Sequence, residues 1–357
     1  MTGNTLGWVI VAFVLYLLMM IAIGAFYAKG NNNSEDYFLG GRKLNGFVAA
    51  LSAQASDMSG WLLMGLPGAI YLTGVGGDGW IAIGLFIGTT LNWLFIATKL
   101  RRYTIRANNS VTLPTYFENR FHDEKKVLMT VSSITIVVFF LVYCASALSA
   151  GGQLFESVFG IDYHVALTIG ALVVLVYTFL GGFTAVCVTD FIQGMLMLVG
   201  ILAVPLFAYH FLTTGGTTLS AGLEASGADS ANFLNLMKNG DGSNNIISVI
   251  SGLGWGLGYF GMPHILVRFM AVRDEKEMTK SKATAISWVA LSLGFAVFIG
   301  ILGRAYLPEL VNGNNEKVFI EMIKKVFTVE MRAPFIAGLF LCGILAAIMS
   351  TADSQLL

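Results

Sequence analysis

Long apolar runs alternate with short polar stretches along this chain. Each run holds about 20 residues or more, which is the length that a helix needs to cross the roughly 30 Å hydrocarbon core of a membrane. The pattern therefore predicts an all-α polytopic membrane protein. We predict nine membrane-spanning segments, near residues 6–28, 45–73, 79–98, 127–155, 163–182, 188–212, 246–271, 283–303 and 333–357.

The composition supports a membrane protein and gives no support for a soluble domain or a nucleic-acid-binding protein. Of the 357 residues, 56% are hydrophobic and 12% are charged, whereas about 25% are charged in an average soluble domain. The formal net charge is zero, which gives no indication of a nucleic-acid partner. The cysteines Cys144, Cys187 and Cys342 lie in apolar runs and form no C-x-x-C pair, so we interpret them as small buried hydrophobic residues.

The distribution of basic residues predicts the orientation. If the nine segments alternate in direction, 15 of the 21 Lys and Arg residues fall on one side of the membrane. Loops rich in Lys and Arg stay in the cytoplasm, so this bias places the N-terminus outside. The first apolar run lacks a basic n-region and a small-residue cleavage motif, and we expect a retained helix rather than a signal peptide.

Two outer connections have distinct compositions. Residues 213–245 are rich in Gly, Ser, Thr and Asn and are expected to form an exposed outer loop. The spacing of apolar residues in 316–327 predicts an amphipathic helix at the same outer surface. The basic loops on the opposite side are expected to be cytoplasmic.

The second predicted segment carries polar residues in its middle. Five of them are Ser52, Gln54, Ser56, Asp57 and Ser59, and Gly60 and Pro67 follow. An ionised Asp at the centre of a membrane helix costs about 3 kcal/mol even on the lenient insertion scale. We therefore predict that this helix is interrupted near its middle and that the Asp57 carboxylate has a functional role.

The segment 251–263 is the second unusual stretch, with five glycines and Pro263 in one apolar run. Residues 256–261 spell G-x-G-x-x-G, but a dinucleotide site also needs a preceding strand, which a membrane segment does not offer. Two interpretations remain: close helix packing through small residues, or a second broken helix with Trp255 and Tyr259 facing a cavity. Its position five segments after the first break favours the second, because inverted five-plus-five repeats bind substrate between two broken helices.

The last segment offers oxygen atoms for a cation. In an ordinary membrane helix the adjacent hydroxyls of Ser350 and Thr351 would bond back to the carbonyl four residues earlier. Alternatively, they form part of a sodium site, because hard cations accept neutral oxygen ligands. The other ligands would be the carbonyl groups of Ala347, Ala55 and Met58, with Asp57 setting the local electric field.

Several motifs in the same order resemble the sodium/solute symporter family, most closely its bacterial proline-transporting branch. They are residues 56–68, 255–264, 268–271 and 350–357, and the resemblance extends over the whole chain. It implies a LeuT-type five-plus-five inverted repeat with one extra N-terminal helix, here ending after core helix eight. The implied parts are 1–44 (extra helix and cytoplasmic loop), 45–212 (first repeat), 213–245 (outer loop) and 246–357 (second repeat, incomplete). Chains of this family run on for several more helices, so we expect this chain to be partial.

The resemblance also implies a function and its residues. It implies sodium-coupled symport of L-proline into the cell by alternating access, in the plasma membrane of a bacterium, rather than an enzyme. The matching sodium ligands are Ala55, Met58, Ala347, Ser350 and Thr351. The matching substrate residues are Ser59, Gly60, Trp61, Tyr143, Trp255, Tyr259 and Pro263. The residues that match positions required for coupling are Asp57, Arg42 and Asp190.

Three alternatives stay open from the sequence. Another small solute, such as a different amino acid, pantothenate or a sugar, would use the same sodium site. Protons could replace sodium through Asp57. A transporter-like sensor or an intramembrane enzyme is a different class, against which the absence of H-E-x-x-H and G-x-S-x-G motifs argues.

Overall fold

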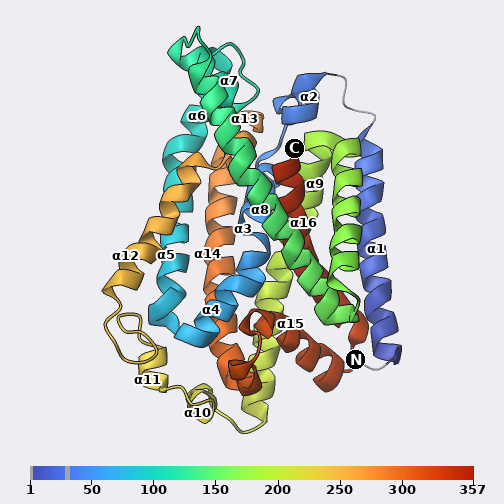
Figure 1. Ribbon diagram of the computed structural model, residues 1–357, viewed down its shortest axis with the longest axis vertical. Coiled ribbons are helices and arrows are strands. Elements are labelled where there is room, and N and C mark those ends of the chain that lie inside the picture. The colour runs from blue at the N-terminus through green and yellow to red at the C-terminus, as the bar shows by residue number, and fades with distance from the viewer. Residues whose placement is uncertain (1–2, 29–32) are drawn as a thin grey trace.

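The computed structural model describes residues 3–28 and 33–357, and within them the chain is helical with no β-strand. The α-helices are α1 (Gly3–Tyr27), α2 (Ser34–Leu39), α3 (Gly46–Gly60), α4 (Leu66–Thr73), α5 (Val75–Leu91), α6 (Ala97–Arg106), α7 (Leu113–Phe121), α8 (Val127–Phe159), α9 (Tyr163–Thr214), α10 (Leu219–Ala225), α11 (Ser230–Phe233), α12 (Ile246–Trp255), α13 (Pro263–Ala271), α14 (Glu275–Tyr306), α15 (Val318–Ile323) and α16 (Pro334–Leu356). Short 3-10 or π-helical turns join several of them. Figure 1 shows most of the long helices running between the two ends of one bundle.

In the described part of the chain, six helices are long and apolar enough to cross a membrane, and α12 with α13 makes a seventh that bends by 48°. Nine segments are predicted, two more than these seven, and the difference has two causes. The predicted segment 45–73 is broken into α3 and α4, each too short on its own. The predicted segments 163–182 and 188–212 both lie in α9, whose 52 residues include a break at Gly182 with φ 61° and ψ −166°. Figure 1 shows the two parts of α9 running in opposite directions.

The predicted interruption of the second segment is confirmed at Ser59. This residue has φ 49° and ψ −174°, a conformation that non-glycine residues rarely adopt. A π-helical turn, Trp61–Gly65, follows the break. Pro67 then lies in the first turn of α4, which continues directly from this π-helical turn. The polar run and the proline thus mark the two sides of the break.

The glycine-rich segment is both broken and closely packed, so both interpretations of its sequence hold. After α12, Gly256–Gly261 form a 3-10 helix and Met262 is extended before α13 begins. A Cβ atom added to Gly84 would lie 2.2 Å from the carbonyl oxygen of Gly252, and one added to Gly88 would lie 2.2 Å from that of Gly256. Glycines therefore let the backbones of α5 and α12 touch.

We predict that Gly88→Ala destabilises the protein, because its methyl group would enter the backbone of the neighbouring helix. Overpacking of this kind costs about 1–3 kcal/mol. Gly254→Ala is the matched control, since nothing lies within 4 Å of its added Cβ, and alanine favours a helix by about 0.5–1 kcal/mol. Thermal unfolding in detergent should place Gly88→Ala below the wild type and Gly254→Ala at or above it. Equal unfolding temperatures for the two variants would contradict the close contact.

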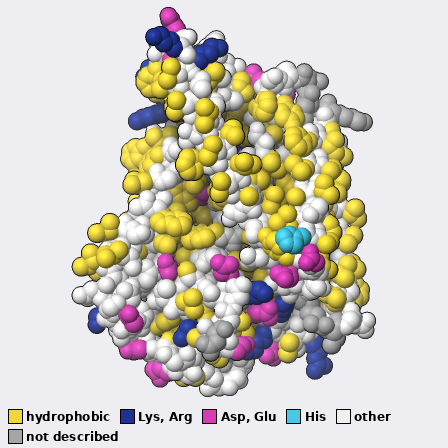
Figure 2. All heavy atoms as spheres, viewed as in Figure 1, with side chains coloured by type: hydrophobic (Ala, Val, Ile, Leu, Met, Phe, Trp, Pro, Cys, Tyr) yellow, Lys and Arg dark blue, Asp and Glu magenta, His cyan; other side chains and the backbone are white. Residues whose placement is uncertain are grey.

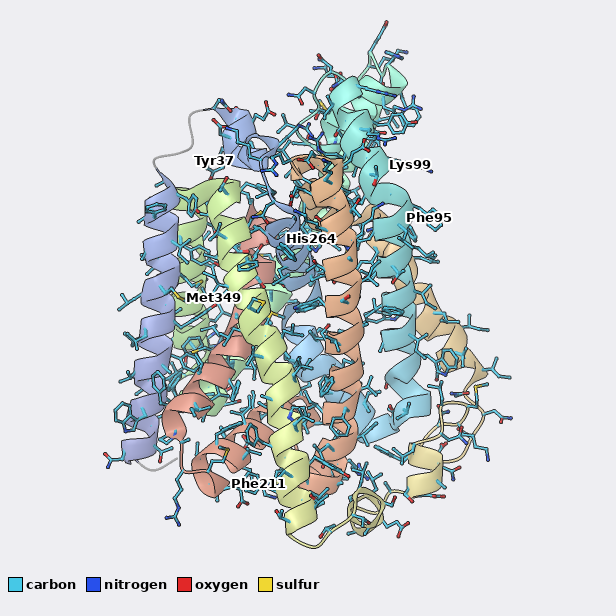
Figure 3. All side chains as sticks on the ribbon, turned by 180° about the vertical axis from the view of Figure 1, so that it is seen from behind. Tyr37, Phe95, Lys99, Phe211, His264 and Met349 are labelled. Carbon is cyan, nitrogen blue, oxygen red and sulfur yellow. The ribbon has the colours of Figure 1, made fainter. Side chains whose placement is uncertain are left out.

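The centre of the bundle is formed by α3 and α9, which pack against each other and against α14 and α16. Nearly every residue of α16 from Ala337 to Ser354 is buried. The extra helix α1 packs on the outside against α9 and α16 (Figure 1). Figure 3 shows Lys99 and Tyr37 towards one end of the bundle, Phe211 towards the other, and His264 and Met349 between them.

The two connections that were predicted to lie outside are more folded than their sequences suggest. The connection 213–245 contains α10 and α11, and its side chains Leu223 and Phe233 are buried. The predicted amphipathic helix 316–327 is divided into a 3-10 turn, α15 and a π-helical stretch. The apolar side chains of α15 are buried against neighbouring helices rather than laid on a membrane surface.

Candidate functional site

Two hydroxyl groups of α16 reach across to the broken helix α3. The Oγ of Ser350 donates to the carbonyl oxygen of Ala55 at 2.8 Å, and the Oγ1 of Thr351 donates to that of Ser56 at 2.9 Å. Both hydroxyls also lie within 3.2 Å of the carbonyl oxygen of Ala347. Each hydroxyl therefore contacts both a carbonyl group of its own helix and a carbonyl group of α3, so the two arrangements considered from the sequence occur together.

Four of the five predicted sodium ligands come together in this cluster: Ala55, Ala347, Ser350 and Thr351. Each hydroxyl has a single proton and two carbonyl neighbours, so lone pairs remain for a cation. The fifth, Met58, has its carbonyl group bonded to the backbone N–H of Trp61. The described residues contain no group of three or more His, Cys, Asp and Glu side chains that could hold a metal ion. A cation here would therefore rely on neutral oxygens.

Asp57 lies next to this cluster in α3 and is 7% exposed. Its Oδ2 atom has no hydrogen-bond partner among the described residues. The phenol of Tyr259 lies against the carboxylate, and the hydroxyl of Tyr143 donates to the Asp57 carbonyl oxygen at 3.3 Å. A buried carboxylate oxygen that lacks a donor is costly, and a nearby cation would remove that cost.

A cavity of about 520 Å³ opens beside the break in α3. Six of the seven predicted substrate residues line it: Ser59, Gly60, Trp61, Tyr143, Trp255 and Tyr259. The indole rings of Trp61 and Trp255 stack with centroids 5.5 Å apart. Figure 2 shows a hollow in this face of the molecule, with acidic side chains in and beside it. The volume and the aromatic walls suit a small organic ligand.

Pro263 is the predicted substrate residue that does not line this cavity. It occupies the first turn of α13, where proline is favoured because that N–H has no helical partner. The residue lines a second cavity instead, together with His264. Its place in the fold is to start the helix after the break.

Some lining residues were missed by the sequence interpretation. Ser146, Ser149 and Gln153 line the cavity from α8. They are polar residues spaced three and four apart in an apolar segment, so they share one face of the helix, and this pattern was a usable signal. Glu316 lines the cavity from the short 3-10 helix Asn315–Lys317, and nothing in its local sequence indicates that position.

Arg42 lies away from both the oxygen cluster and the cavity. Its guanidinium group donates to the carbonyl oxygens of Met270 and Ser110, each at 2.8 Å, and to Asn109 at 3.0 Å. The side chain is buried and joins the segment before α3 to the end of α13 and to the connection between α6 and α7. Arg42 therefore fixes a junction at the end of the bundle that holds Lys99 (Figure 3).

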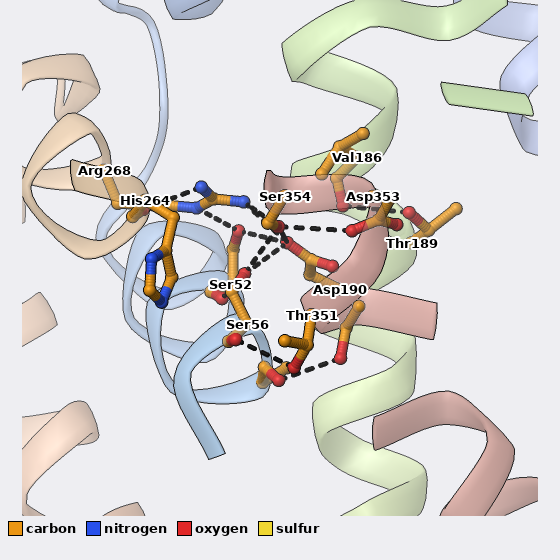
Figure 4. Close-up of polar contacts among 12 residues, drawn as sticks. Ser52, Ser56, Val186, Thr189, Asp190, His264, Arg268, Thr351, Asp353 and Ser354 are labelled. Atoms are coloured by element: carbon orange, nitrogen blue, oxygen red, sulfur yellow. Dashed lines mark hydrogen bonds and ion pairs between the residues drawn. The ribbon is translucent and has the colours of Figure 1, made fainter. Parts of the chain in front are cut away.

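Asp190 lies in a buried polar cluster between α3, α9, α13 and α16 (Figure 4). Its Oδ2 atom is 3.0 Å from Nη2 of Arg268 and accepts hydrogen bonds from Ser52 and Ser56 at 2.7 and 3.1 Å. The Oγ of Ser354 lies 2.5 Å from the same Arg268 nitrogen. Side-chain exposure is 1% for Arg268 and 0% for Asp190, so this is a fully desolvated ion pair. The cluster borders the cation site because Ser56 belongs to both.

Two broken helices flank a cavity, and a cluster of neutral oxygens lies beside a buried carboxylate in the same layer of the bundle. Unwound membrane helices with free carbonyl groups at the midplane are the hallmark of secondary transporters built from inverted repeats. The fold and the site therefore define a secondary transporter.

The comparisons with known proteins name the family. A family model described as the sodium:solute symporter family matches residues 37–357. The chain belongs to this family. The sodium/proline symporters of Salmonella typhimurium and Escherichia coli are 45% and 44% identical to it over 354 residues, which is 98% of this chain and 68% of each relative. That of Staphylococcus aureus is 43% identical over 350 residues, 97% of this chain and 65% of the relative. The chain thus spans about two thirds of the length of these relatives.

One solved structure has the same fold. It is described as the substrate-bound outward-open state of a Na⁺-coupled sialic acid symporter, and it matches with a TM-score of 0.80 and 21% identity. The match covers 98% of this chain and 72% of the other. The predicted LeuT-type fold is confirmed by this likeness, and the protein is a multi-pass membrane protein.

Proposed function

We propose that this protein carries out sodium-coupled symport of L-proline into the cell by alternating access. The observation that carries the proposal is the oxygen cluster of Ala55, Ala347, Ser350 and Thr351, which adjoins an aromatic-walled cavity. The relatives named sodium/proline symporters, at 43 to 45% identity, support this ion and this solute.

Sodium binds first in this mechanism. Its ligands come from α3 and α16, so the bound ion holds the two helices together and stabilises the state in which the cavity is formed. The carboxylate of Asp57 supplies a negative field beside the ion and faces the same cavity. Met58 completes the shell if its carbonyl group turns away from the Trp61 N–H.

Proline then enters the cavity of about 520 Å³. Its carboxylate binds to backbone amides near Ser59 and Gly60, where the break leaves the start of the second half-helix open. Its apolar ring packs on Trp255, Tyr259 and Tyr143. The cavity then closes on the outer side and opens on the inner side, and both solutes are released. One charge crossing 100 mV supplies about 2.3 kcal/mol, equivalent to about a fiftyfold gradient of proline.

We also propose the membrane and the orientation. The protein belongs in the plasma membrane of a bacterium with its N-terminus outside, because the predicted alternation of the segments places 15 of the 21 Lys and Arg residues on the side that holds Lys99. Arg42 and Asp190 contribute to coupling by holding α13 against α3 and α9. Labelling of single cysteines introduced near residues 100 and 230, in intact cells, tests the orientation.

Uptake of radiolabelled proline into proteoliposomes tests the function. The protein should be purified at the full length that the cell produces. Uptake should require an inward sodium gradient and should not be driven by a pH gradient without sodium. Competition by other amino acids, pantothenate and sugars then defines the solute. Uptake that does not depend on sodium, or that another solute blocks more strongly than unlabelled proline does, would overturn the proposal.

Thr351→Ala is expected to weaken sodium activation. The change removes one oxygen from the cluster, and a hydrogen-bond-like contact to a charged group is worth about 1.5–3 kcal/mol, or about 10- to 150-fold in affinity. The sodium concentration for half-maximal uptake should rise by at least about tenfold. Thr135→Ala is the matched control, because this exposed threonine on α8 bonds to its own helix at Val131. Unchanged sodium activation in Thr351→Ala would remove Thr351 from the site.

A further inference from the structure

A second cavity, of about 380 Å³, lies on the other side of the break in the glycine-rich segment. Its walls come from α13, the end of α16, α8 and residues 111–115, and they are mostly apolar. Residues 111–115 lie around the start of α7, at the end of the bundle that holds Lys99, whereas the first cavity reaches Glu316 in the connection towards the opposite end (Figures 1 and 3). The two cavities therefore open towards opposite ends.

His264 stands at the boundary between the two cavities. Its ring centroid lies 5.4 Å from that of Phe140 and 6.3 Å from that of Tyr143. Phe140 lines the second cavity and Tyr143 lines the first. Figure 4 shows the imidazole directed away from the guanidinium group of Arg268. The three rings form an aromatic wall between the two cavities.

The polar atoms in the second cavity are unusual. His264 is 3% exposed, and neither of its ring nitrogens has a hydrogen-bond partner among the described residues. Both amide atoms of Gln355 in the same cavity are buried and also without a partner in that part of the chain. Native proteins rarely leave such groups unsatisfied, so a ligand is the natural explanation.

The chemistry of these atoms indicates the ligand class. A neutral imidazole offers one donor and one acceptor, and a primary amide offers two donors and one acceptor. Together they match a carboxylate and an ammonium group, while Phe140 and Val267 offer an apolar wall. A small amphipathic zwitterion satisfies both requirements, whereas a hydrocarbon chain would leave the polar atoms unpaired.

We propose that the second cavity is a release site, in which the transported imino acid binds through His264 and Gln355 after it leaves the first cavity. The inference rests on the proposed function. His264 is then a positioning residue for the cytoplasmic half of the transport cycle. It contributes nothing to binding from the outside.

The test is the KM for proline measured separately from each side, in right-side-out and inside-out vesicles. His264→Phe keeps an aromatic ring on Phe140 and Tyr143 and removes both nitrogens. The KM from the cytoplasmic side should rise about two- to tenfold, as expected for a lost hydrogen bond, while the KM from the outside and the sodium activation stay unchanged. His264→Gln should restore part of the loss. His210→Phe, a matched change at an exposed position of α9, should alter neither KM.

The outcomes separate the inference from the function it rests on. Wild-type vesicles without sodium-driven proline uptake would refute the proposed function before any variant is made. With active wild type, equal changes on both sides or no change in His264→Phe would overturn the release site, and the second result would favour a lipid tail as occupant. If His264→Phe fails to fold, Gln355→Leu has to show the same one-sided rise, and its failure to do so is equally decisive.

Discussion

Replacing Asp57 by alanine is expected to reduce sodium-driven proline uptake to the background of vesicles without the protein. The carboxylate is buried beside the oxygen cluster and faces the first cavity. A unit charge about 6 Å from a monovalent cation contributes about 2.8 kcal/mol at an effective dielectric constant of about 20, equivalent to about 100-fold in affinity. A site made of the neutral oxygens alone would then be occupied only at a much higher sodium concentration.

The charge and the shape of Asp57 can be separated by further variants. Asp57→Asn keeps the size and loses the charge, so it should behave as Asp57→Ala does, whereas Asp57→Glu should retain part of the uptake at raised sodium. Asp241→Ala, in the connection 213–245, is the control for loss of an acidic residue outside the site. Near-normal uptake by Asp57→Ala at ordinary sodium concentrations would contradict the role given to this carboxylate.

Replacing Arg268 by methionine is expected to destabilise the protein severely. The change leaves the Asp190 carboxylate at 0% exposure without its counterion. Removing one partner of a buried ion pair typically costs about 3–5 kcal/mol, because the remaining charge stays desolvated. We expect a much lower yield of folded protein and a lower unfolding temperature in detergent.

The double variant Arg268→Met with Asp190→Leu distinguishes a lost charge balance from lost packing. Neutral replacement of both partners often restores stability, so the double variant should unfold at a higher temperature than the single one. The exposed pair of Arg102 and Glu275 provides the control, since side-chain exposures of 55% and 59% predict a cost of at most about 1 kcal/mol for Arg102→Met. A single variant as stable as the wild type, or a double variant no better than the single one, would refute this account.

The sequence was most informative where the chain departs from an ordinary membrane helix. The polar run around Asp57 and the glycines before Pro263 predicted both breaks, because such residues disfavour a continuous apolar helix. The adjacent hydroxyls of Ser350 and Thr351 predicted the oxygen cluster, since few other groups in that segment can face a cation. These are local signals that depend on residue type and spacing.

Features that depend on the packing of distant segments were not predictable in the same way. Arg268 and Asp190 are charged residues in apolar runs, which indicates partners but does not say which acid is the partner, because Asp353 is buried nearby as well. Glu316 reaches the first cavity from the 3-10 helix Asn315–Lys317, and its place is set by contacts with α4 and the π-helical turn that follows the break. The position of Pro263 outside the first cavity follows from the bend of 48°, which the sequence does not encode as an angle.

The paired glycines between α5 and α12 have a consequence for motion. Gly84 meets Gly252 and Gly88 meets Gly256 through main-chain atoms, with no side chain that could change rotamer and yield. Sliding one helix past the other would drive carbonyl oxygens into Cα atoms, so the two helices have to move together as one rigid unit. Spectroscopic labels on the outward surfaces of α5 and α12 should keep a constant separation throughout the transport cycle, while each changes its distance to α8.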